Sequence, residues 1–585
     1  MYYWKALAFL RSRVLVNQPT SLSLTEVTNA LGCTKRNAQL VIKKLVSEGW
    51  VDWKSGVGRG NLPTLTLLKS LDSELEVRID ELLSENKVDQ ALDLVDESQR
   101  DQFLLGYISR YQSLPTELDI LQIPFYRGTH SLDPIEVTRR TEAHITSYLF
   151  SNLLRFNKST HSFDGDLAID WYQTEHRWHF TLRKGLVFHD GSPILAQDVK
   201  AHFQRLIGSN HHNSQQFKCI SAITVIDPLH LCFDINANTG YLPSLLSCSA
   251  AGVAKKVGDK IIGSGSFKLV EQSEWLTRLE VFSSYHGHRP WVDGIEIWNV
   301  GDKAKDYEMH CDIVHSHPHY QHSSISNELA EIEQWEKGCE YALINPHRHT
   351  WLSNPQHLKS LSELLRLLGI AKDIPLDTVG YAEGMLSTSN QSTQPKIETA
   401  NNQSPLQMAR QFADQHSKPK QPLKILTYQL FDHIKMARHY CDRLNELGFI
   451  CEYQVLEFPE FCQPDNLKDA DILISGEVFS DNLDSSWMGW LQSSIALEVC
   501  LTDEQKQWRD ESLERLWKIT DYQQRQPVFL DIEAQLITFG IYRPIFHVKQ
   551  QLNYAKTVNP VEQLANGWID FNQITMRRYI GQFLN

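Results

Sequence analysis

The charge of the first 69 residues is the feature that most constrains this chain. They contain ten Lys or Arg against three Asp or Glu, a net charge of +7, while the whole chain carries −14 and the remainder therefore −21. A basic segment in front of an acidic remainder is typical of a nucleic-acid-binding module joined to a part with another role. The sequence thus predicts at least two units with different partners.

The apolar spacing within this basic segment predicts three helices. Apolar residues recur at helical spacing in residues 3–14. Ser23 and Glu26 form a capping-box pattern that begins a short second helix, and Gly32 ends that helix. Thr34 is the predicted N-cap of the third helix. This order of helices is typical of a helix-turn-helix motif.

The exposed face of the third helix carries residue types that suit the major groove of DNA. Asn and Gln can pair with adenine edges, Arg with guanine, and Lys with phosphates. Within residues 51–67, apolar and polar residues alternate on both sides of a Gly-rich basic tip, which predicts a two-stranded wing. The predicted DNA-binding residues are Thr34, Lys35, Arg36, Asn37, Gln39, Lys43, Lys44, Lys54 and Arg59. A winged helix used for protein contacts is the alternative.

Length and composition indicate that the remainder of the chain is globular. At roughly 150 residues per domain, a chain of 585 residues predicts three or four domains. No stretch approaches the roughly 18 apolar residues that a membrane span needs, so we expect no membrane partner. The ten cysteines are scattered without a CxxC pair, which favours reduced thiols and a cytoplasmic location.

Residues 71–115 are predicted to form an acidic helical connector behind the head. Residues 70–114 contain eleven acidic residues against four basic ones, and apolar residues recur at helical spacing between 75 and 95. DNA phosphates repel a segment with a net charge of −7, so the connector helps to orient the head. A coiled-coil dimer is the alternative, but Asn86 and Lys87 interrupt the pattern early.

Beyond Pro115 the pattern changes to alternating strands and helices, and several motifs resemble a known family. Residues 132–134 (LDP), 178–191 (WHFTLRKGLVFHDG), 263–269 (GSGSFKL) and 295–298 (IEIW) occur in the order expected for the oligopeptide/nickel-type extracellular solute-binding proteins. The resemblance extends over most of the remaining chain. It implies two α/β lobes with a ligand in the cleft between them.

Together, head and module are similar to the SgrR-type transcriptional regulators, which carry a winged helix in front of a solute-binding-like module. The matching segments are 50–53 (WVDW), 58–60 (GRG), 140–145 (RTEAHI), 336–339 (EKGC) and 567–571 (GWIDF). The resemblance implies a cytoplasmic regulator. The family prototype answers to sugar-phosphate stress and activates a small-RNA gene and transporter genes.

The resemblance therefore implies a multidomain chain with an α+β winged helix-turn-helix head, a helical connector and a two-lobed α/β module. The module is periplasmic-binding-protein-like, of type II and family 5. An apolar strand at 470–474 is the expected return crossing to the first lobe. The predicted boundaries are 1–70 for the head, 71–115 for the connector, 116–299 for the first lobe, 300–474 for the second lobe with a mobile polar insertion near 387–404, and 475–585 for the return to the first lobe.

A ligand that contacts both lobes would favour a closed form and so change the DNA affinity or polymerase contact of the head. The expected partners are double-stranded DNA, a small-molecule effector such as a sugar phosphate, and RNA polymerase. An Arg pair can clasp a phosphate or carboxylate, and a Trp face suits a sugar. The candidate ligand-binding residues are Arg139, Arg140, Glu142, Asn345, Trp487 and Trp490. Surface ion pairs and core tryptophans are the alternatives.

A cluster of histidines suggests a rival role in metal binding. His315, His317 and His319 alternate as they would on one face of a strand, with His310 and His322 nearby, and imidazole suits zinc, copper or nickel. Pro318 interrupts that strand, so our prediction assigns no metal site.

Catalytic motifs are absent from the sequence. It contains no Walker loop, GxSxG elbow or HExxH motif, and no GxGxxG in a βαβ setting, so we expect neither an enzyme nor a cofactor. Two readings of the module stay open, a small-molecule sensor and an interaction or dimerisation platform that has lost its ligand. A metal- or peptide-binding protein is a further alternative.

Overall fold

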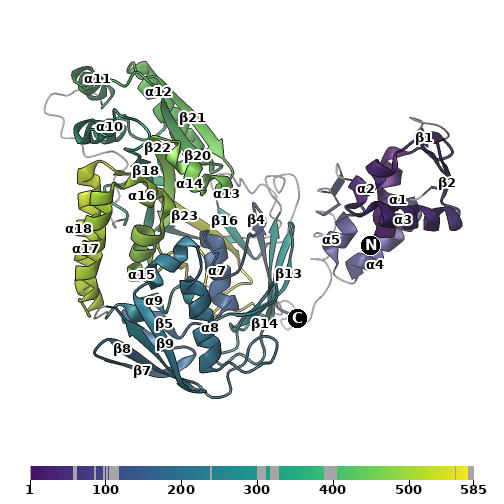
Figure 1. Cartoon of the computed structure of the whole chain (residues 1–585), viewed down its shortest axis with the longest axis horizontal. Helices are drawn as coiled ribbons and strands as arrows, with labels where there is room; N and C mark the ends of the chain where they lie inside the picture. Colours follow the sequence, from purple (N-terminus) through teal and green to yellow (C-terminus); the bar gives the residue numbers. More distant parts are fainter. Residues whose placement is uncertain are drawn as a thin grey trace, which may run out of the picture.

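A small N-terminal unit and a large two-lobed module make up the chain (Figure 1). The structure is a computed structural model. It describes residues 2–56, 62–70, 72–84, 87–96, 99–100, 103–104, 118–236, 240–299, 311–316, 329–387, 405–559 and 562–576.

The head has the predicted helices and wing. The Ser23 hydroxyl accepts a hydrogen bond from the Glu26 amide, and the Glu26 carboxylate accepts one from the Ser23 amide, so the predicted capping box is confirmed. Gly32 ends the helix with a φ of +58°, which Gly adopts without the steric cost of a Cβ. The wing tip, Arg59 included, lies outside the described residues. The elements are α1 (Tyr2–Arg13), β1 (Pro19–Ser21), α2 (Leu24–Leu31), α3 (Lys35–Ser47), β2 (Val51–Lys54) and β3 (Thr64–Leu67), with sheet order β1-β3-β2.

The connector packs onto the head and completes its core. It contains α4 (Asp72–Ser84) and α5 (Val88–Leu92), which confirms the predicted helical character. Leu75, Ile79 and Leu82 are each 5% exposed or less and belong to the same buried cluster as the helices of the head. Burial of each such side chain stabilises the head by about 1.5–3 kcal/mol.

The first lobe contains two antiparallel-rich sheets with helices packed against them. One sheet has the order β13-β14-β15-β4, in which β15 and β4 run parallel, and the other has the order β7-β8-β10-β9. In β8, Trp178, Phe180 and Leu182 alternate inward and are 8%, 1% and 2% exposed. The elements are β4 (Ile120–Phe125), α7 (Arg140–Leu149), β5 (Leu154–Asn157), β6 (Ser162–Gly165), β7 (Ala168–Thr174), β8 (Arg177–Leu182), α8 (Ala196–Ile207), β9 (Ile220–Asp227), β10 (His230–Ile235), α9 (Leu242–Leu245), β11 (Lys255–Val257), β12 (Lys260–Ile262), β13 (Phe267–Gln272), β14 (Leu276–Val281) and β15 (Gly294–Asn299).

The second lobe is built on the largest sheet, with the order β16-β23-β18-β22-β20-β21 and with β17 and β19 also paired to β23. Helices α17 and α18 lie together along the side of this lobe (Figure 1). The elements are β16 (Ile313–Ser316), β17 (Leu329–Trp335), β18 (Gly338–Ile344), α10 (Pro355–Leu368), β19 (Val379–Tyr381), α11 (Pro405–Gln415), β20 (Leu423–Tyr428), α12 (Phe431–Glu446), β21 (Cys451–Leu456), α13 (Phe458–Phe461), α14 (Pro464–Lys468), β22 (Ile472–Val478), α15 (Leu483–Met488), α16 (Ile495–Cys500), α17 (Asp503–Trp517), α18 (Tyr522–Phe539) and β23 (Tyr542–Ala555).

The crossing back to the first lobe occurs later than the sequence predicts. The expected return strand at 470–474 instead forms part of β22, which is paired on both sides within the second lobe, to β18 and β20. The chain returns through β23, which pairs with β18 near Phe546 and with β16 near Asn553. Apolar strands of this kind are equally typical of a sheet centre, so hydrophobicity alone did not separate the two roles.

Other sequence-based boundaries lie where the structure gives no description. The polar insertion near 387–404 falls outside the described residues except for Ser387. After β23, residues Val558, Trp568 and Phe571 join the buried cluster of the first lobe, so the C-terminal part of the predicted return does lie there.

The packing of α4 predicts that its two faces tolerate substitution differently. We expect Leu75→Ala to lower the free energy of unfolding of the head by about 2–5 kcal/mol, because it leaves a cavity. Val77→Ala on the same helix is the matched control, since Val77 is 58% exposed. Native-state hydrogen exchange of residues 35–47 measures both effects. Equal exchange rates in the two variants would show that α4 does not complete the head core.

Candidate functional site

The face of α3 that is expected to contact DNA is open to solvent. Thr34 caps the helix by accepting a hydrogen bond from the Asn37 amide at 3.4 Å. Lys44 lies 4.7 Å from the ring centroid of Tyr3 and 3.9 Å from the Glu48 carboxylate. All seven predicted residues of this helix are exposed, namely Thr34, Lys35, Arg36, Asn37, Gln39, Lys43 and Lys44.

Two further residues of the head bear on this surface. Lys54, at the end of β2, has a side chain that is 75% exposed and forms an ion pair with Asp52 at 3.3 Å. Leu40 lies between the basic residues of α3 and is 57% exposed, an unusual place for a large apolar side chain. A thymine methyl group is a suitable partner for such a side chain in the major groove. Sequence reasoning missed Leu40 because an apolar residue in a helix is ordinarily assigned to the core.

A cleft between the lobes encloses a cavity of about 1010 Å³. Its walls include the end of β4, the start of α7, the middle of β23 and the segment that follows β22. A cavity of this size suits a small molecule. Of the six predicted ligand residues, Arg139, Arg140 and Trp490 line this cavity, and Glu142, Asn345 and Trp487 do not.

Arg139 presents a cation to the cleft. It occupies the N-cap position of α7 without capping it, and its guanidinium lies 4.2 Å from the ring centroid of Phe458 on the second lobe. No residue in the described part of the chain forms a hydrogen bond or ion pair with this guanidinium. Burial and the neighbouring Arg127 lower the pKa of Arg139, because both disfavour the cation. An anionic ligand would relieve this cost.

Arg140 is committed to a contact between the lobes. Its Nη1 donates to Oε1 of Glu336 at 2.6 Å, and Glu336 lies between β17 and β18. The Gln550 side chain on β23 donates to the same oxygen. The Glu336 side chain is 7% exposed, and burial raises its pKa although Arg140 opposes the rise. Of the two predicted arginines, Arg140 therefore forms an ion pair, whereas Arg139 forms none with the described residues.

Glu142 does not reach the cleft, contrary to the sequence-based prediction. It is buried, and its two carboxylate oxygens accept hydrogen bonds from Arg127 at 2.6 and 3.0 Å. It also accepts one from the His130 amide at 2.9 Å. Hydrogen bonds from Arg127 and His130 hold the pKa of Glu142 below its ordinary value despite burial. Glu142 orders the loop after β4 and is not among the residues that line the cleft.

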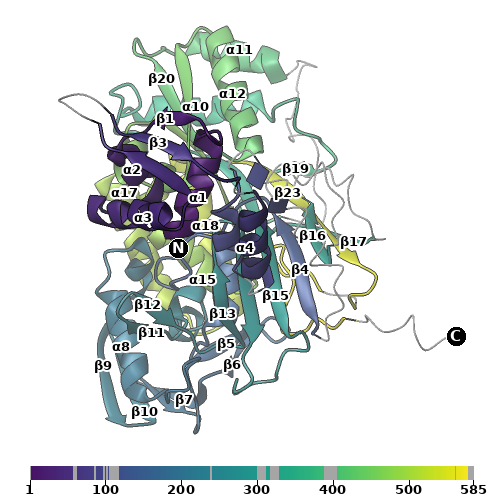
Figure 2. The same ribbon diagram turned by 90° about the vertical axis from the view of Figure 1, so that its right-hand side faces the viewer.

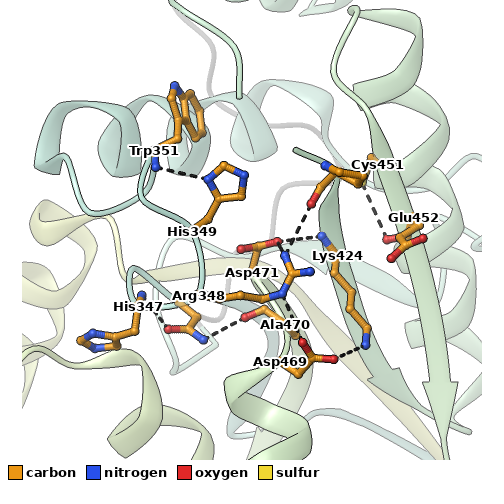
Figure 3. Close-up of polar contacts among 12 residues, drawn as sticks. His347, Arg348, His349, Trp351, Lys424, Cys451, Glu452, Asp469, Ala470 and Asp471 are labelled. Atoms are coloured by element: carbon orange, nitrogen blue, oxygen red, sulfur yellow. Dashed lines mark hydrogen bonds and ion pairs between the residues drawn. The ribbon is translucent and has the colours of Figure 1, made fainter. Parts of the chain in front are cut away.

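Asn345 likewise has a structural role. Its Nδ2 donates to the carbonyl of Ala470 at 2.9 Å, and its Oδ1 accepts from the His347 amide at 3.0 Å. Figure 3 shows the polar network around this loop, in which Arg348 reaches Asp471 at 2.5 Å. The network fastens the loop after β18 to β20 and β22, away from the residues that line the cleft.

The two tryptophans differ in position. Trp487 is fully buried and stacks on Phe529, with ring centroids 5.8 Å apart, so it belongs to the core. Trp490 lines the cleft, but it is 2% exposed and its Nε1 donates to the Tyr341 hydroxyl at 3.2 Å. Only a small part of the Trp490 ring is therefore available to a ligand. Periodicity could not separate these positions, because Trp487 in α15 and Trp490 in the helical turn after it are only three residues apart.

The second lobe contributes carboxylates to the cleft that sequence reasoning missed. Glu340 on β18 pairs with His433, and its carboxylate occupies the space where a side chain at position 476 would begin. Only glycine at position 476 leaves room for the Glu340 carboxylate. Burial and the nearby Glu340 raise the pKa of Glu477 to about 7. Scattered acidic residues in an acidic chain give no sequence signal, and only the pairing of β18 with β22 brings these two together.

The histidine cluster is largely outside the described residues, since His310, His317, His319 and His322 are not described. Within the described ranges, no group of three or more His, Cys, Asp or Glu is arranged to hold a metal ion. Among the same residues, no helix has both the length and the apolar character to span a membrane.

Comparisons with known proteins identify the two units. Residues 8–111 match the family described as sugar transport-related sRNA regulator N-term, and residues 163–496 match bacterial extracellular solute-binding proteins, family 5 middle. The chain is 25% identical over 570 residues to the HTH-type transcriptional regulator SgrR of Yersinia enterocolitica, covering 94% of this chain and 95% of that protein.

Solved structures of binding proteins share the fold of the module. A dipeptide binding protein from Pseudoalteromonas sp. SM9913 in complex with Met-Leu has a TM-score of 0.63 at 17% identity, covering 78% of this chain and 100% of that chain. The oligopeptide-binding protein AppA from Bacillus subtilis, in complex with a nonapeptide, has a TM-score of 0.64 at 14% identity, covering 78% and 98%. The predicted fold class is therefore confirmed.

The raised pKa of Glu477 predicts a pH-dependent stability. Its pKa of about 7 in the folded chain exceeds its ordinary value of 4.5, so folding favours the protonated form. Stability should therefore fall as the pH rises through this interval. We expect Glu477→Gln, which cannot ionise, to raise the melting temperature relative to wild type at about pH 8 and much less at about pH 5.

Glu452→Gln is the matched control for this measurement, because Glu452 is exposed on β21 of the same sheet. The melting temperatures of wild type and the two variants, measured across the pH range, test this prediction. A constant difference between wild type and Glu477→Gln at all pH values would contradict the raised pKa.

Proposed function

Because the chain belongs to the bacterial extracellular solute-binding proteins of family 5 and carries the SgrR-type regulator domain in front, we propose that it is a cytoplasmic DNA-binding regulator whose cleft binds a small anionic effector. The HTH-type transcriptional regulator SgrR of Yersinia enterocolitica aligns with this chain over nearly the whole length of both proteins. The partners we propose are double-stranded DNA, the effector and RNA polymerase.

The unpaired Arg139 guanidinium is the observation that carries the effector proposal. A cation in a cleft that forms no hydrogen bond or ion pair with any described residue is a favourable site for a phosphate or carboxylate group. The opposite wall presents Glu340 and Glu477, whose oxygens can accept hydrogen bonds from hydroxyl groups. Phosphate on one side and hydroxyls on the other are the groups of a sugar phosphate, the effector class that the family resemblance implies.

The DNA proposal rests on the exposed face of α3. Its residues offer the donors and acceptors that read base edges, and the basic segment supplies charge for the phosphates. Leu40 adds an apolar contact in the middle of the same face.

We propose no catalytic role for the module. Its relatives are regulators and its structural neighbours are binding proteins, which supports binding without chemistry. Two carboxylates of the cleft have a side-chain partner in the protein, Glu336 with Arg140 and Glu340 with His433.

A second function has specific support, namely a platform that binds no ligand. The chain's own side chains join the lobes beside the cleft, through Arg140 with Glu336 and Arg139 with Phe458. The buried Ser244 hydroxyl also donates to Asp484 at 3.1 Å, linking α9 to α15. A module held closed by its own contacts would need no effector.

The effector proposal predicts ligand-dependent stabilisation that requires Arg139. At a concentration of about 100 times its Kd, a ligand stabilises the fold that binds it by about 2.7 kcal/mol. We expect glucose 6-phosphate to raise the melting temperature of the full chain by a few degrees, with glucose, a dipeptide and nickel ions as the remaining panel. Arg139→Ala should abolish the shift.

Arg177→Ala is the control, because Arg177 pairs with Asp234 on an exposed sheet and does not line the cleft. An unchanged melting temperature with every compound of the panel would favour the platform that binds no ligand. A shift that survives in Arg139→Ala would place the anion elsewhere.

The DNA proposal predicts a specific loss in two head variants. Arg36→Ala and Lys43→Ala should each weaken binding to the DNA upstream of the protein's own gene, and a lost phosphate contact should reduce the salt slope by about one. Lys184→Ala, an exposed basic residue of the module, is the control. Gel-shift titrations at several salt concentrations measure both quantities. Unchanged affinity in both head variants would exclude α3 as the recognition helix.

A further inference from the structure

Helix α5 of the connector contributes to two separate buried clusters. Ala91, with the following Leu94 and Val95, completes the core of the head. Val88 and Leu92 belong instead to a cluster that includes residues of the module. A helix whose side chains are divided in this way is held by both units at once.

The second cluster forms an apolar interface that we term the dock. Each of its members is 2% exposed or less, so the interface excludes water. Its module side comes from β14, β15, β16 and Cys311, which lies two residues before β16, and Trp298 is its largest side chain. The dock consists of Val88, Leu92, Leu104, Leu276, Trp298, Cys311 and Val314.

The strands beneath the dock are attached to strands that line the cleft. Trp298 of the dock is the register partner of Pro124 on β4, and Pro124 lines the cleft. Val314 of the dock is the register partner of Asn553 on β23, two residues from Gln551, which also lines the cleft. One step between hydrogen-bonded strands therefore separates the cleft wall from the dock.

The strands under the dock are also the ones that join the lobes. Residue Asp312, immediately before β16, bonds through its amide to the Gln122 carbonyl on β4 at 3.0 Å, and its carbonyl accepts from the Ala555 amide of β23 at 2.8 Å. Rotation of one lobe against the other must bend or shift these strands. The dock therefore lies on strands that are hydrogen-bonded to β4 and β23.

On the other side, α5 is tied to the helices of the head. Asp93 forms an ion pair with Lys5 of α1 at 2.6 Å, and Arg11 of α1 donates to the Leu94 carbonyl at 3.5 Å. Helix α1 in turn contacts α3, where Lys44 lies over the Tyr3 ring. In Figure 1, α5 lies on the side of the head toward the module, and in Figure 2 α4 lies in front of β15.

We propose that the dock is the switch of this protein: a change in the angle between the lobes alters or releases the dock, and through α5 repositions the recognition helix. Closely packed apolar surfaces do not deform continuously, so the dock should have two states rather than a gradual response. The role of an effector in setting the lobe angle rests on the proposed function. The mechanical coupling of cleft to dock does not.

The test perturbs each end of this coupling in the full chain without effector or DNA. Arg140→Ala removes the ion pair between the lobes, and we expect hydrogen exchange of residues 88–92 and 311–316 to become about tenfold faster. Arg177→Ala, which removes an ion pair on the outer sheet, should leave both segments unchanged.

The reciprocal variant is Leu92→Asp, with Val77→Asp on the exposed face of α4 as its control. We expect Leu92→Asp to speed exchange at residues 294–299 of the module, about 200 positions away in sequence, by about tenfold as well. If Leu92→Asp does not fold, Arg140→Ala alone decides. Unchanged exchange at 88–92 in Arg140→Ala overturns the proposal, even when an effector binds the cleft. Absence of any effector, in contrast, would not affect this result.

Discussion

The backbone pairing of β23 is the constraint on which the module depends. This strand runs for 14 residues: near Phe546 it pairs with β18 of the second lobe, and near its end Leu552 and Ala555 are buried in the cluster of the first lobe. Buried amides and carbonyls must remain paired, so neither lobe can separate from the strand without a large cost. A change in the angle between the lobes therefore bends this strand and its neighbours. The position of the cleft, beside the middle of β23, follows from that restriction.

The same constraint explains the distribution of charge around the cleft. Glu336 is buried next to β23, where an unpaired carboxylate would be costly, and Arg140 from the other lobe supplies the compensating charge at 2.6 Å. The adjacent Arg139 extends to the Phe458 ring and forms no ion pair with any residue that the structure describes. Two neighbouring residues of one helix thus differ in role, one joining the lobes and the other available to a ligand. Their sequence neighbours alone do not distinguish them.

Local signals in the head were reliable because they concern backbone groups close in sequence. The Ser23 and Glu26 capping box, the Gly32 terminus and the Thr34 cap all formed as predicted. The cleft residues depended on contacts between distant segments. Glu142 and Asn345 have the polar groups that a ligand could use, but Arg127, Ala470 and other distant partners occupy them.

The sequence by itself determined the helix-turn-helix head, the helical connector and the class of the module, because charge, apolar periodicity and caps act within a few residues. Only the tertiary structure decided that β22 stays in the second lobe and β23 makes the return crossing. It also decided that Val88 and Leu92 join the module while Ala91 joins the head. Strand order and the assignment of an apolar face to one of two cores are set by long-range packing, and a periodic pattern carries no information about which partner it meets.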